Sequence, residues 1–550
     1  MPGGQGRAAA VTLLVATGTA GVVASAAVAS GRPILASRWS LLAELGAWSL
    51  AWAVGVGTAL RLPPRVSVSV VIVFGVALRL AALAGPPTTS DDLYRYSWDG
   101  RVQAAGIDPY AHPPTSPALA ELRDPWLWPD SGGCASLHRP LGCTRINRPG
   151  QRTIYPPVAE AWFAAVYRAT GIGARHKAWQ VAGLLTELGV LALLPLALRR
   201  WGRDPRWVAL YALSPAPVLE LVNNGHVDGL AILAIVAALA VMFSAGDQDR
   251  PGADIAAGAL IGAAALVKLY PAILILVLVG AGRPHHWRAA VRAGVTATIL
   301  VALAYLPHVL AVGPKVLGYL PGYLKEEHYS GGGRFLIAGA LRIPPHLAGP
   351  ASAAAVAAVA VWVAVRRPPA PDAAALLLGA VFLATSPVQP WYAVALLAVA
   401  TVAARPSWVL VVIAAYPYFF AVILANAHAI GIGQFCYTAA GISVVGAAAA
   451  RARRGRVTLG SVIGHGPDRG APVGDRLGHP CDRAARPVDL SGPPPVRGPS
   501  PPRRAQRPGP RRVAPRGPVD LHDRDDGDGR LAPAVPGRTT DARRLPPGGP

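Results

Sequence analysis

Residues 66–114 read VSVSVVIVFGVALRLAALAGPPTTSDDLYRYSWDGRVQAAGIDPYAHPP. The first part, residues 66–84, is apolar apart from two serines and one arginine. It approaches the ~20 residues that a helix needs to cross a bilayer. The second part, Thr88–Pro114, is polar, aromatic and acidic. A membrane span followed directly by reactive side chains predicts a membrane protein whose chemistry lies next to the bilayer.

The composition of the whole chain agrees with this prediction. Of 550 residues, 52% are hydrophobic and 15% are charged, unlike a soluble domain. Because only helices or closed barrels cross bilayers, we expect an all-α, polytopic integral membrane protein with about 11–14 transmembrane helices. The candidate spans are residues 8–29, 41–60, 66–84, 178–198, 207–222, 229–245, 254–268, 271–282, 289–307, 350–366, 373–386, 391–404, 407–424 and 432–450.

The apolar runs divide the chain into four regions. We expect N-terminal transmembrane helices, a large first extracytoplasmic loop, a transmembrane core, and a basic Pro/Arg/Gly-rich tail. A tail of such composition is predicted to be disordered. The regions are residues 1–85, 86–177, 178–450 and 451–550.

Two segments allow alternative interpretations. Residues 8–29 are interpreted as a retained helix, although small residues near their end also resemble a signal-peptidase site. Residues 154–170 are amphipathic, and Pro156 and Pro157 suit a helix start, so we expect a helix lying in the membrane interface. If residues 154–170 crossed the membrane instead, the orientation of every later span would be inverted.

The net charge of +23 does not indicate nucleic-acid binding, because the arginines form short clusters between apolar runs and in the tail. When the loop with Arg61 and Arg65 is taken as cytoplasmic, alternation of spans brings nearly every other basic cluster to that side. The alternation requires a helix broken at Pro271. We therefore predict a multi-pass protein of the plasma (inner) membrane with an extracytoplasmic active site.

The acidic motif is predicted to form a short helix. Ser90 can cap it, and Gly106 can end it. Helical periodicity then places one stripe of side chains on a common face: Asp92, Arg95, Tyr96, Asp99 and Gln103. A capped surface helix with an Asp91–Arg95 ion pair is the simpler interpretation. An acid pair that takes a proton from an acceptor hydroxyl is the functional one.

Residues 91–110, DDLYRYSWDGRVQAAGIDPY, resemble the first outer-loop motif of bacterial glycosyltransferases of the GT-C superfamily. They look closest to its mannosyltransferase-like branch. Three later segments are similar to further landmarks of these enzymes, namely Thr153–Pro157, Asn224–Asp228 and Lys268–Pro271. The resemblance implies a multi-pass enzyme that uses polyprenyl-phosphate sugars and has its catalytic acid at Asp91 or Asp92.

The remaining site predictions combine this resemblance with the cost of polar groups at membrane depth. Lys268 has no acid nearby in sequence, so it needs a phosphate or a distant carboxylate such as Glu187 or Glu220. Snorkelling is its alternative. The candidates for donor or phosphate binding are Lys268, Tyr270, His226, Arg95, Lys325 and His328. The candidates for substrate binding are Tyr94, Asp99, Asn224, Asp228 and Trp391.

Cys134 and Cys143 share the first loop, where an oxidising exterior would allow a disulfide, with two free thiols as the alternative. No metal-ligand spacing is evident, so no cofactor is assigned. A divalent cation between the acids and a phosphate is the one cofactor considered.

These observations predict a membrane glycosyltransferase that moves a hexose, first of all mannose, from a polyprenyl-phosphate donor to a glycolipid or polysaccharide acceptor. Since the acceptor attacks opposite the leaving phosphate, an inverting single displacement is expected. The donor sugar could instead be glucose, galactose or arabinose. A transporter or flippase of polyprenyl-linked sugars is the alternative class, but it should show repeated halves and ionisable groups near mid-membrane.

Overall fold

The computed structural model describes residues 4–34, 38–137, 139–242, 250–280, 286–329 and 334–463. Within them every regular element is a helix and no strand occurs. Eight of the described helices are long and apolar enough to cross a membrane, and five shorter apolar helices accompany them. The predicted all-α polytopic fold is therefore confirmed. Residues 464–550, where disorder was expected, lie outside the described part of the chain.

The N-terminal region forms a three-helix unit. Helix α1 packs against both α2 and α3, and Ser25 Oγ in α1 donates a hydrogen bond to the Leu78 carbonyl of α3 at 2.9 Å. The short η1 then leads into the acidic motif. The bounds are α1 (Gly4–Ser30), α2 (Arg38–Ala59), α3 (Pro64–Ala81) and η1 (Ala82–Ala84).

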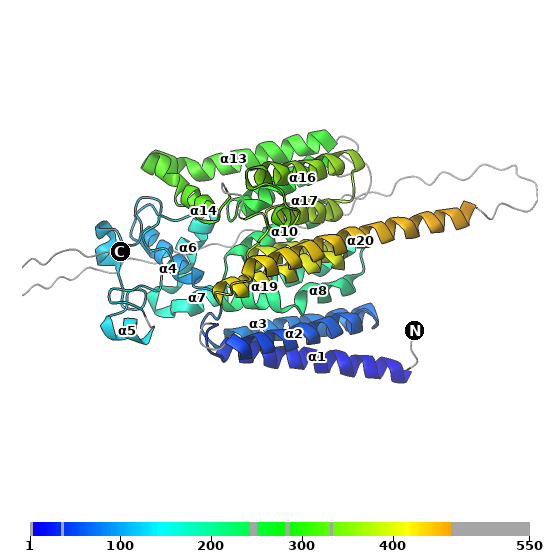
Figure 1. Ribbon diagram of the computed structural model, residues 1–550, viewed down its shortest axis with the longest axis horizontal. Helices are drawn as coiled ribbons and strands as arrows, with labels where there is room; N and C mark the ends of the chain where they lie inside the picture. Colours follow the sequence, from blue (N-terminus) through cyan, green and yellow to red (C-terminus); the bar gives the residue numbers. More distant parts are fainter. Residues whose placement is uncertain are drawn as a thin grey trace, which may run out of the picture. The chain divides into compact units, whose positions relative to one another are not determined.

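The first loop is folded into short helices at one end of the bundle, on the left in Figure 1. Helix α6 starts at Pro157, as predicted, and packs against α4. Its 14 residues are fewer than the ~20 that a span needs, which supports the interfacial interpretation. The elements are α4 (Asp92–Ala104), η2 (Pro117–Leu122), α5 (Ser131–Ser136), α6 (Pro157–Thr170) and η3 (Ile172–Ala174).

The core begins with a long helix followed by short and broken ones. A π-helical turn, η5, replaces the end of the span expected at residues 207–222. These elements are α7 (Arg175–Arg200), η4 (Pro205–Trp207), α8 (Val208–Ala212), α9 (Pro215–Pro217), η5 (Val218–Asn223), α10 (Asp228–Val241), α11 (Pro251–Ala265), η6 (Tyr270–Leu276) and α12 (Val277–Gly280).

In the second half, α18 is buried on nearly all sides and packs against α17, α19 and α10. Helix α20 continues beyond residue 451, the expected start of the tail. The elements are α13 (His286–Val312), η7 (Gly313–Leu317), α14 (Leu320–Glu326), α15 (Leu336–Ala340), α16 (Pro345–Arg366), α17 (Ala370–Ala384), α18 (Pro390–Ala403), η8 (Pro406–Trp408), α19 (Val409–Ile423) and α20 (Ala429–Ile463).

The helix break predicted near Pro271 is present between α11 and η6. It exposes the Leu266 carbonyl, which accepts hydrogen bonds from the backbone amides of Val158 and Ala159 at 3.1 and 3.3 Å. These amides belong to the first turn of α6, where N–H groups lack partners within the helix. Two incomplete helix ends thus satisfy each other, and this contact fixes Lys268 beside the first loop.

The basic loops gather at the other end of the bundle. The Arg206 guanidinium donates to the Leu60 and Leu62 carbonyls at 2.7 and 2.9 Å. Nearby in the chain, Arg203 pairs with Asp372, which also pairs with Arg405. Helix α3 starts at this basic end and finishes just before the acidic motif. The two kinds of loop are therefore separated by the length of a helix, as alternation of spans predicts.

Candidate active site

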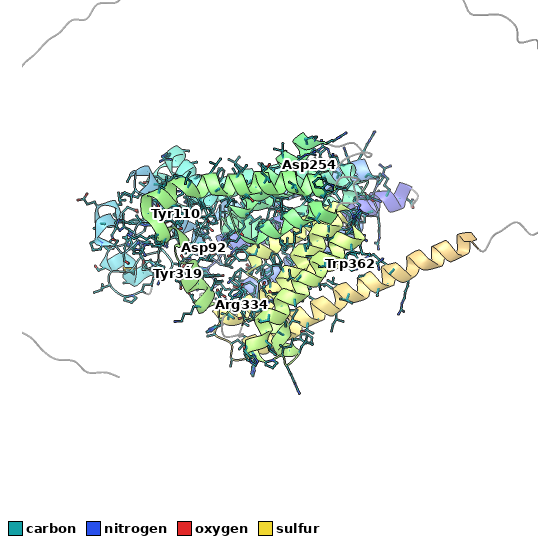
Figure 2. The ribbon with its side chains drawn as sticks, turned by 90° about the horizontal axis from the view of Figure 1, so that it is seen from above. Asp92, Tyr110, Asp254, Tyr319, Arg334 and Trp362 are labelled. Atoms are coloured by element: carbon teal, nitrogen blue, oxygen red, sulfur yellow. A yellow bond between two sulfur atoms is a disulfide. The ribbon has the colours of Figure 1, made fainter. Side chains whose placement is uncertain are left out.

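A cavity of about 450 Å³ lies at the end of the bundle that carries the first loop. Its walls come from α4, the segment before α6, the break at Lys268, α14, the segment before α18 and the end of α19. Figure 2 shows Asp92, Tyr319 and Arg334, three of its lining residues, close together. Cationic side chains outnumber anionic ones in the lining, which suits an anionic ligand. They are Arg95, Arg148, Arg152, Lys268 and Arg334, against Asp92, Glu326 and Glu327.

Helix α4 holds the acidic motif in a buried position. Ser90 Oγ accepts a hydrogen bond from the Asp92 amide at 3.2 Å, and Gly106, with φ of +79°, follows the helix end. Gly100 allows α4 to approach α6, because a Cβ there would lie 2.5 Å from the Phe163 carbonyl oxygen. The predicted stripe faces this contact, so α4 is not the exposed surface helix of the simpler interpretation.

The structure distinguishes the two adjacent acids. Asp92 lines the cavity, and its Oδ1 accepts a hydrogen bond from Asn147 Nδ2 at 2.6 Å. The Tyr155 hydroxyl donates to Asp92 Oδ2 at 3.4 Å. Asp91 does not line the cavity: its side chain is half exposed and pairs with Arg139 at 3.1 Å. The Asp91–Arg95 ion pair therefore does not form.

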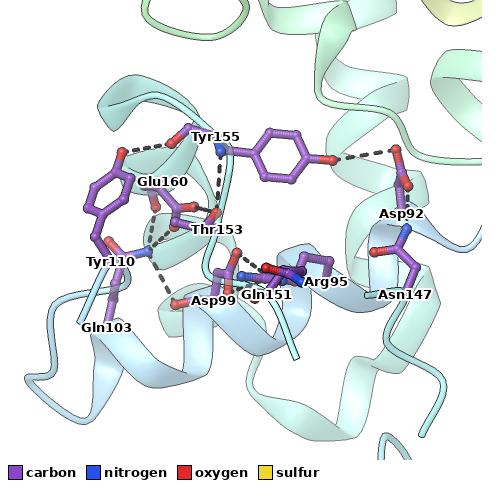
Figure 3. Close-up of polar contacts among 10 residues, drawn as sticks. All are labelled: Asp92, Arg95, Asp99, Gln103, Tyr110, Asn147, Gln151, Thr153, Tyr155 and Glu160. Atoms are coloured by element: carbon purple, nitrogen blue, oxygen red, sulfur yellow. Dashed lines mark hydrogen bonds and ion pairs between the residues drawn. The ribbon is translucent and has the colours of Figure 1, made fainter. Parts of the chain in front are cut away.

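Arg95 is held by α4 itself and presents a free donor. Its Nε donates to both Asp99 carboxylate oxygens at 2.9 Å, and Nη1 donates to the Gln151 carbonyl at 3.0 Å (Figure 3). The buried Nη2 has no hydrogen-bond partner within the described residues. Since Arg95 lines the cavity and a buried unpaired donor is costly, this guanidinium is ready to bind an anion.

Behind Arg95, Asp99 shares a buried network with Glu160 of α6. Glu160 accepts hydrogen bonds from Thr153 Oγ1 at 2.5 Å and Gln103 Nε2 at 2.8 Å (Figure 3). Burial raises the pKa of the Asp99 carboxyl, and burial together with the charge of Asp99 raises the pKa of Glu160 well above its ordinary value. The stronger rise at Glu160 favours a protonated Glu160 beside an Asp99 carboxylate that pairs with Arg95.

Lys268 stands at the helix break and lines the cavity. Its Nζ lies 3.8 Å from Asp228 Oδ2 and 4.6 and 4.9 Å from the ring centroids of Tyr155 and Tyr392. The distant carboxylate that this lysine needed is thus Asp228. Glu187 instead accepts hydrogen bonds from Arg79, at 3.0 and 2.8 Å.

His226 lies behind the cavity wall. Its Nδ1 is 3.5 Å from Asp92 Oδ2, and its ring stacks on Trp391, which lines the cavity, at 4.2 Å between centroids. Burial lowers the pKa of His226 to about 4, although Asp92 opposes this shift. The imidazole is therefore neutral at pH 7 and lies beside the Asp92 carboxylate as a polar, uncharged neighbour.

Several other predicted residues do not line the cavity. Asn224 is fully buried, and its Oδ1 accepts hydrogen bonds from the Thr88 and Thr89 amides at 3.1 Å, so it positions the start of the acidic motif. Tyr94 packs edge-on against Trp126. The remaining two, Lys325 and His328, are exposed.

Helix α14 covers one side of the cavity opening. Glu326 at its end accepts hydrogen bonds from Arg148 of the first loop, at 3.1 Å from Nε, and from Tyr319. The backbone amide of Tyr319 donates to the Thr153 carbonyl at 3.2 Å. Tyr323, Glu327 and Arg334, which belong to the same part of the chain, also line the cavity.

A smaller chamber of about 270 Å³ adjoins the cavity. The residues that line both include Tyr155, Lys268, Tyr323, Arg334 and Tyr392. The rest of the chamber is mostly apolar and includes Tyr270, the one predicted donor-binding residue found only on this side. Its other apolar lining residues include Leu269, Leu320, Leu324, Val381 and Phe382.

Three residues that hydrogen-bond to the site were not predicted from the sequence: Asn147, Gln151 and Glu160. Asn147 and Gln151 lie in a loop rich in arginine and proline, where no periodicity sets them apart. Glu160 sits in an amphipathic helix, where a lone acid normally faces solvent. Only the contact between α4 and α6 gives these side chains a role.

Cys134 and Cys143 form a disulfide, with Cα atoms 5.8 Å apart. Among the described residues no group of three or more His, Cys, Asp or Glu side chains could hold a metal ion.

Residues 153–387 match the model of glycosyltransferase family 87. The match indicates a membrane glycosyltransferase. It begins at Thr153 and contains His226, Lys268 and Arg334, whereas α4 with Asp92 lies outside it. No curated protein and no solved structure matches the chain. A glycosyltransferase requires a sugar donor and an acceptor, and the cavity is the place to seek both.

Proposed function

We propose that the protein transfers a hexose from a polyprenyl-phosphate donor to a glycolipid or polysaccharide acceptor by an inverting single displacement. Mannose is the first candidate, because the acidic motif resembles the mannosyltransferase-like branch of the GT-C superfamily. The observation that carries the proposal is one cavity that combines Asp92 with Lys268 and Arg95 and opens into an apolar chamber.

Asp92 acts as the general base. Asn147 and Tyr155 each donate a hydrogen bond to it, which fixes the carboxylate while leaving lone pairs for an acceptor hydroxyl. As the acceptor oxygen attacks the anomeric carbon, its proton passes to Asp92. The bond between that carbon and the donor phosphate oxygen breaks, and polyprenyl phosphate leaves with the electron pair.

Lys268, Arg95 and Arg334 stabilise the charge on the leaving phosphate. Arg95 Nη2 is buried without a partner, and Arg334 Nε is likewise unpaired within the described residues. Such pre-positioned cations bind phosphate strongly in a site shielded from water. The Lys268 ammonium lies over the Tyr155 ring, whose hydroxyl contacts Asp92, so Tyr155 stands between the acid and the cation.

The apolar chamber takes the start of the polyprenyl chain. It shares Lys268 and Arg334 with the cavity, so a phosphate bound by these cations would lead its hydrocarbon chain into the chamber. The donor would enter from the bilayer side of α14 and α17.

The active site is proposed to face the extracytoplasmic side of the plasma (inner) membrane. The segregation of Arg203, Arg206 and Arg405 at the other end supports this orientation through the positive-inside rule. The Cys134–Cys143 disulfide in the first loop also supports it, because such bridges persist in oxidising compartments.

The test is transfer by the purified full-length protein in nanodiscs. Polyprenyl-phosphate mannose, glucose, galactose and arabinose, each radiolabelled in the sugar, are supplied with a glycolipid and polysaccharide extract of the source membranes. We expect labelled product and released polyprenyl phosphate with one of these donors. A flippase would move donor across a vesicle membrane but release no polyprenyl phosphate, and that result would reject the enzyme.

The catalytic acid is tested with two matched variants. Asp92→Asn should lower the transfer rate ~10²- to 10⁴-fold, the usual contribution of a general base. Asp91→Asn, which removes a half-exposed carboxylate paired with Arg139, should stay within a few-fold of the parent. Equal losses in both variants, or none in Asp92→Asn, would contradict the assignment.

A further inference from the structure

A second cavity, of about 650 Å³, lies outside the site described so far. It forms a groove between α2, α9, η5 and α19 and is predominantly apolar. Leu45, Trp52, Leu219 and Phe420 are among its lining residues. In a membrane protein a groove of this composition suits a hydrocarbon chain.

Helix α19 separates this groove from the catalytic cavity. Pro417 and Phe420 line the groove, whereas Phe419 and Val422 line the cavity. The 3.6-residue period places these pairs on different faces of one helix. Near the end of α19 the two spaces are therefore divided by this one helix.

The groove reaches the end of the bundle that contains the catalytic cavity. Leu42, near the start of α2, and Asn426, just after the end of α19, line one end of the groove. The start of α2 and the end of α19 both lie at the end of the bundle that carries the first loop. The groove continues along α2 as far as Trp52. A lipid chain in it would thus belong to the leaflet whose headgroups lie level with Asp92.

The groove is connected to Asp92 through neighbouring side chains, whereas the apolar chamber borders Lys268 and Arg334. Tyr416 of the groove is next to Glu220, whose carboxylate is 3.7 Å from His226 Nε2. His226 Nδ1 is in turn 3.5 Å from Asp92. Lys268 and Arg334, by contrast, border the apolar chamber.

We infer that this groove binds the hydrocarbon chain of a lipid-anchored acceptor, whose headgroup reaches Asp92 over the end of α19. The inference rests on the proposed function and narrows its acceptor to a glycolipid. An inverting displacement brings the acceptor and the leaving phosphate to opposite faces of the sugar, so the two lipids need separate chain sites. The chamber beside the cations serves the donor, and the groove beside the acid serves the acceptor.

Two glycines of α2 provide a matched test. Gly46 lines the groove and Gly57 does not, and a Cβ at either position would meet no atom within 4 Å. Neither position is therefore closed to a side chain by an atom beside its Cβ. We would place the photo-crosslinking residue p-benzoylphenylalanine at each position in the full-length protein and irradiate membranes of the source cell. Mass spectrometry would then identify the attached lipid.

The expected result is a glycolipid attached at position 46 and bulk phospholipid at position 57. Polyprenyl phosphate at position 46 would assign the groove to the donor, and the same phospholipid at both positions would make the groove an ordinary lipid contact. Either result overturns the inference. Because crosslinking needs no turnover, it is independent of whether transfer is observed.

A kinetic measurement complements the crosslink. Gly46→Leu should raise the KM for the glycolipid acceptor about tenfold, the effect of displacing roughly two methylene contacts. The KM for the donor should not change, and Gly57→Leu should behave as the parent. An unchanged acceptor KM in Gly46→Leu would overturn the inference even if transfer itself is confirmed.

Discussion

At the scale of single residues, Lys268 shows how a buried charge is made tolerable. Its carboxylate partner, Asp228, lies at 3.8 Å, longer than a close ion pair, and two aromatic rings face the ammonium. This environment keeps the charge in place while leaving donors for a ligand. A residue balanced in this way should contribute more to binding a phosphate than to stability.

Lys268→Ala is accordingly expected to raise the KM for the donor about ten- to hundredfold, the value of a hydrogen bond to a charged group. Lys268→Arg should restore binding only in part, because a planar guanidinium cannot replace a compact ammonium. Lys325→Ala is the matched control, since Lys325 is exposed and lines neither cavity. Donor titrations by turnover measure all three, and equal KM values for Lys268→Ala and the parent would leave the lysine a structural role only.

The sequence predicts the positions of single side chains best where they follow the periodicity of one helix. The stripe from Asp92 to Gln103 follows from helical periodicity alone, and its members contact α6 or the loop segment before it. Helical periodicity could not show which of Asp91 and Asp92 lines the cavity. That choice depends on Asn147 and Arg139, which the chain brings to α4 from a distant part of an irregular loop.

At the scale of elements, the contact between α4 and α6 determines the geometry of the site. Glu160 projects from α6 into the Arg95–Asp99 pair and holds Gln103 of α4 through both its backbone carbonyl and its carboxyl oxygen. Because the pKa of Glu160 is raised well above its ordinary value by burial, the folded protein binds a proton here that the unfolded chain releases. The contact is therefore sensitive to pH.

The stability that this contact contributes should decrease as the pH rises. A carboxyl with a raised pKa contributes its full stability below the unfolded pKa of ~4.3, and this stability is lost as pH rises through the folded pKa. Glu160→Gln keeps the neutral hydrogen bonds and removes the titration. The melting temperature of the parent should thus fall more steeply than that of Glu160→Gln as the pH rises above about 5. The exposed Glu121 gives the control Glu121→Gln, and parallel profiles for all three proteins would refute the buried proton.

The sequence predicted the long apolar helices correctly, but it predicted less well the places where helices break. Spans such as residues 178–198 are recovered within α7 because length and hydropathy alone specify them. The span expected at residues 207–222 instead divides into α8, α9 and the π-helical η5, with Pro215 and Pro217 at the division. Prolines indicate a break, but the backbone that replaces the helix depends on neighbours such as Trp52, which donates to the Leu210 carbonyl at 3.1 Å.

At the scale of the whole molecule, the bundle has two chemically different ends. Figure 1 shows α4 and α6 together at one end of the bundle. That end carries the cavity, and the other carries the clustered arginines. Sequence reasoning predicted this polarity because alternation of spans needs only their number and order. It could not predict the groove beside α19, since the walls come from α2 and α19, which are far apart in the chain.

The two ends make the orientation in the membrane testable with cysteines. In a protein with Cys436→Ser and Cys481→Ser, the disulfide pair Cys134 and Cys143 should react with a membrane-impermeant maleimide in intact cells only after reduction. An outer placement exposes this loop to the reagent, and the bridge blocks both thiols until it is reduced. Labelling is read by a mass shift on gels, with and without prior reduction.

The opposite end supplies the matched control for this orientation. Arg61→Cys, in a background with all four native cysteines replaced by serine, places one thiol in the exposed loop between α2 and α3. It should be labelled only after the membrane is permeabilised, because the positive-inside rule puts this basic end in the cytoplasm. If Arg61→Cys were labelled in intact cells while the reduced Cys134 and Cys143 were not, the bundle would be inverted. Asp92 and its cavity would then face the cytoplasm, and a donor in the outer leaflet could not reach them.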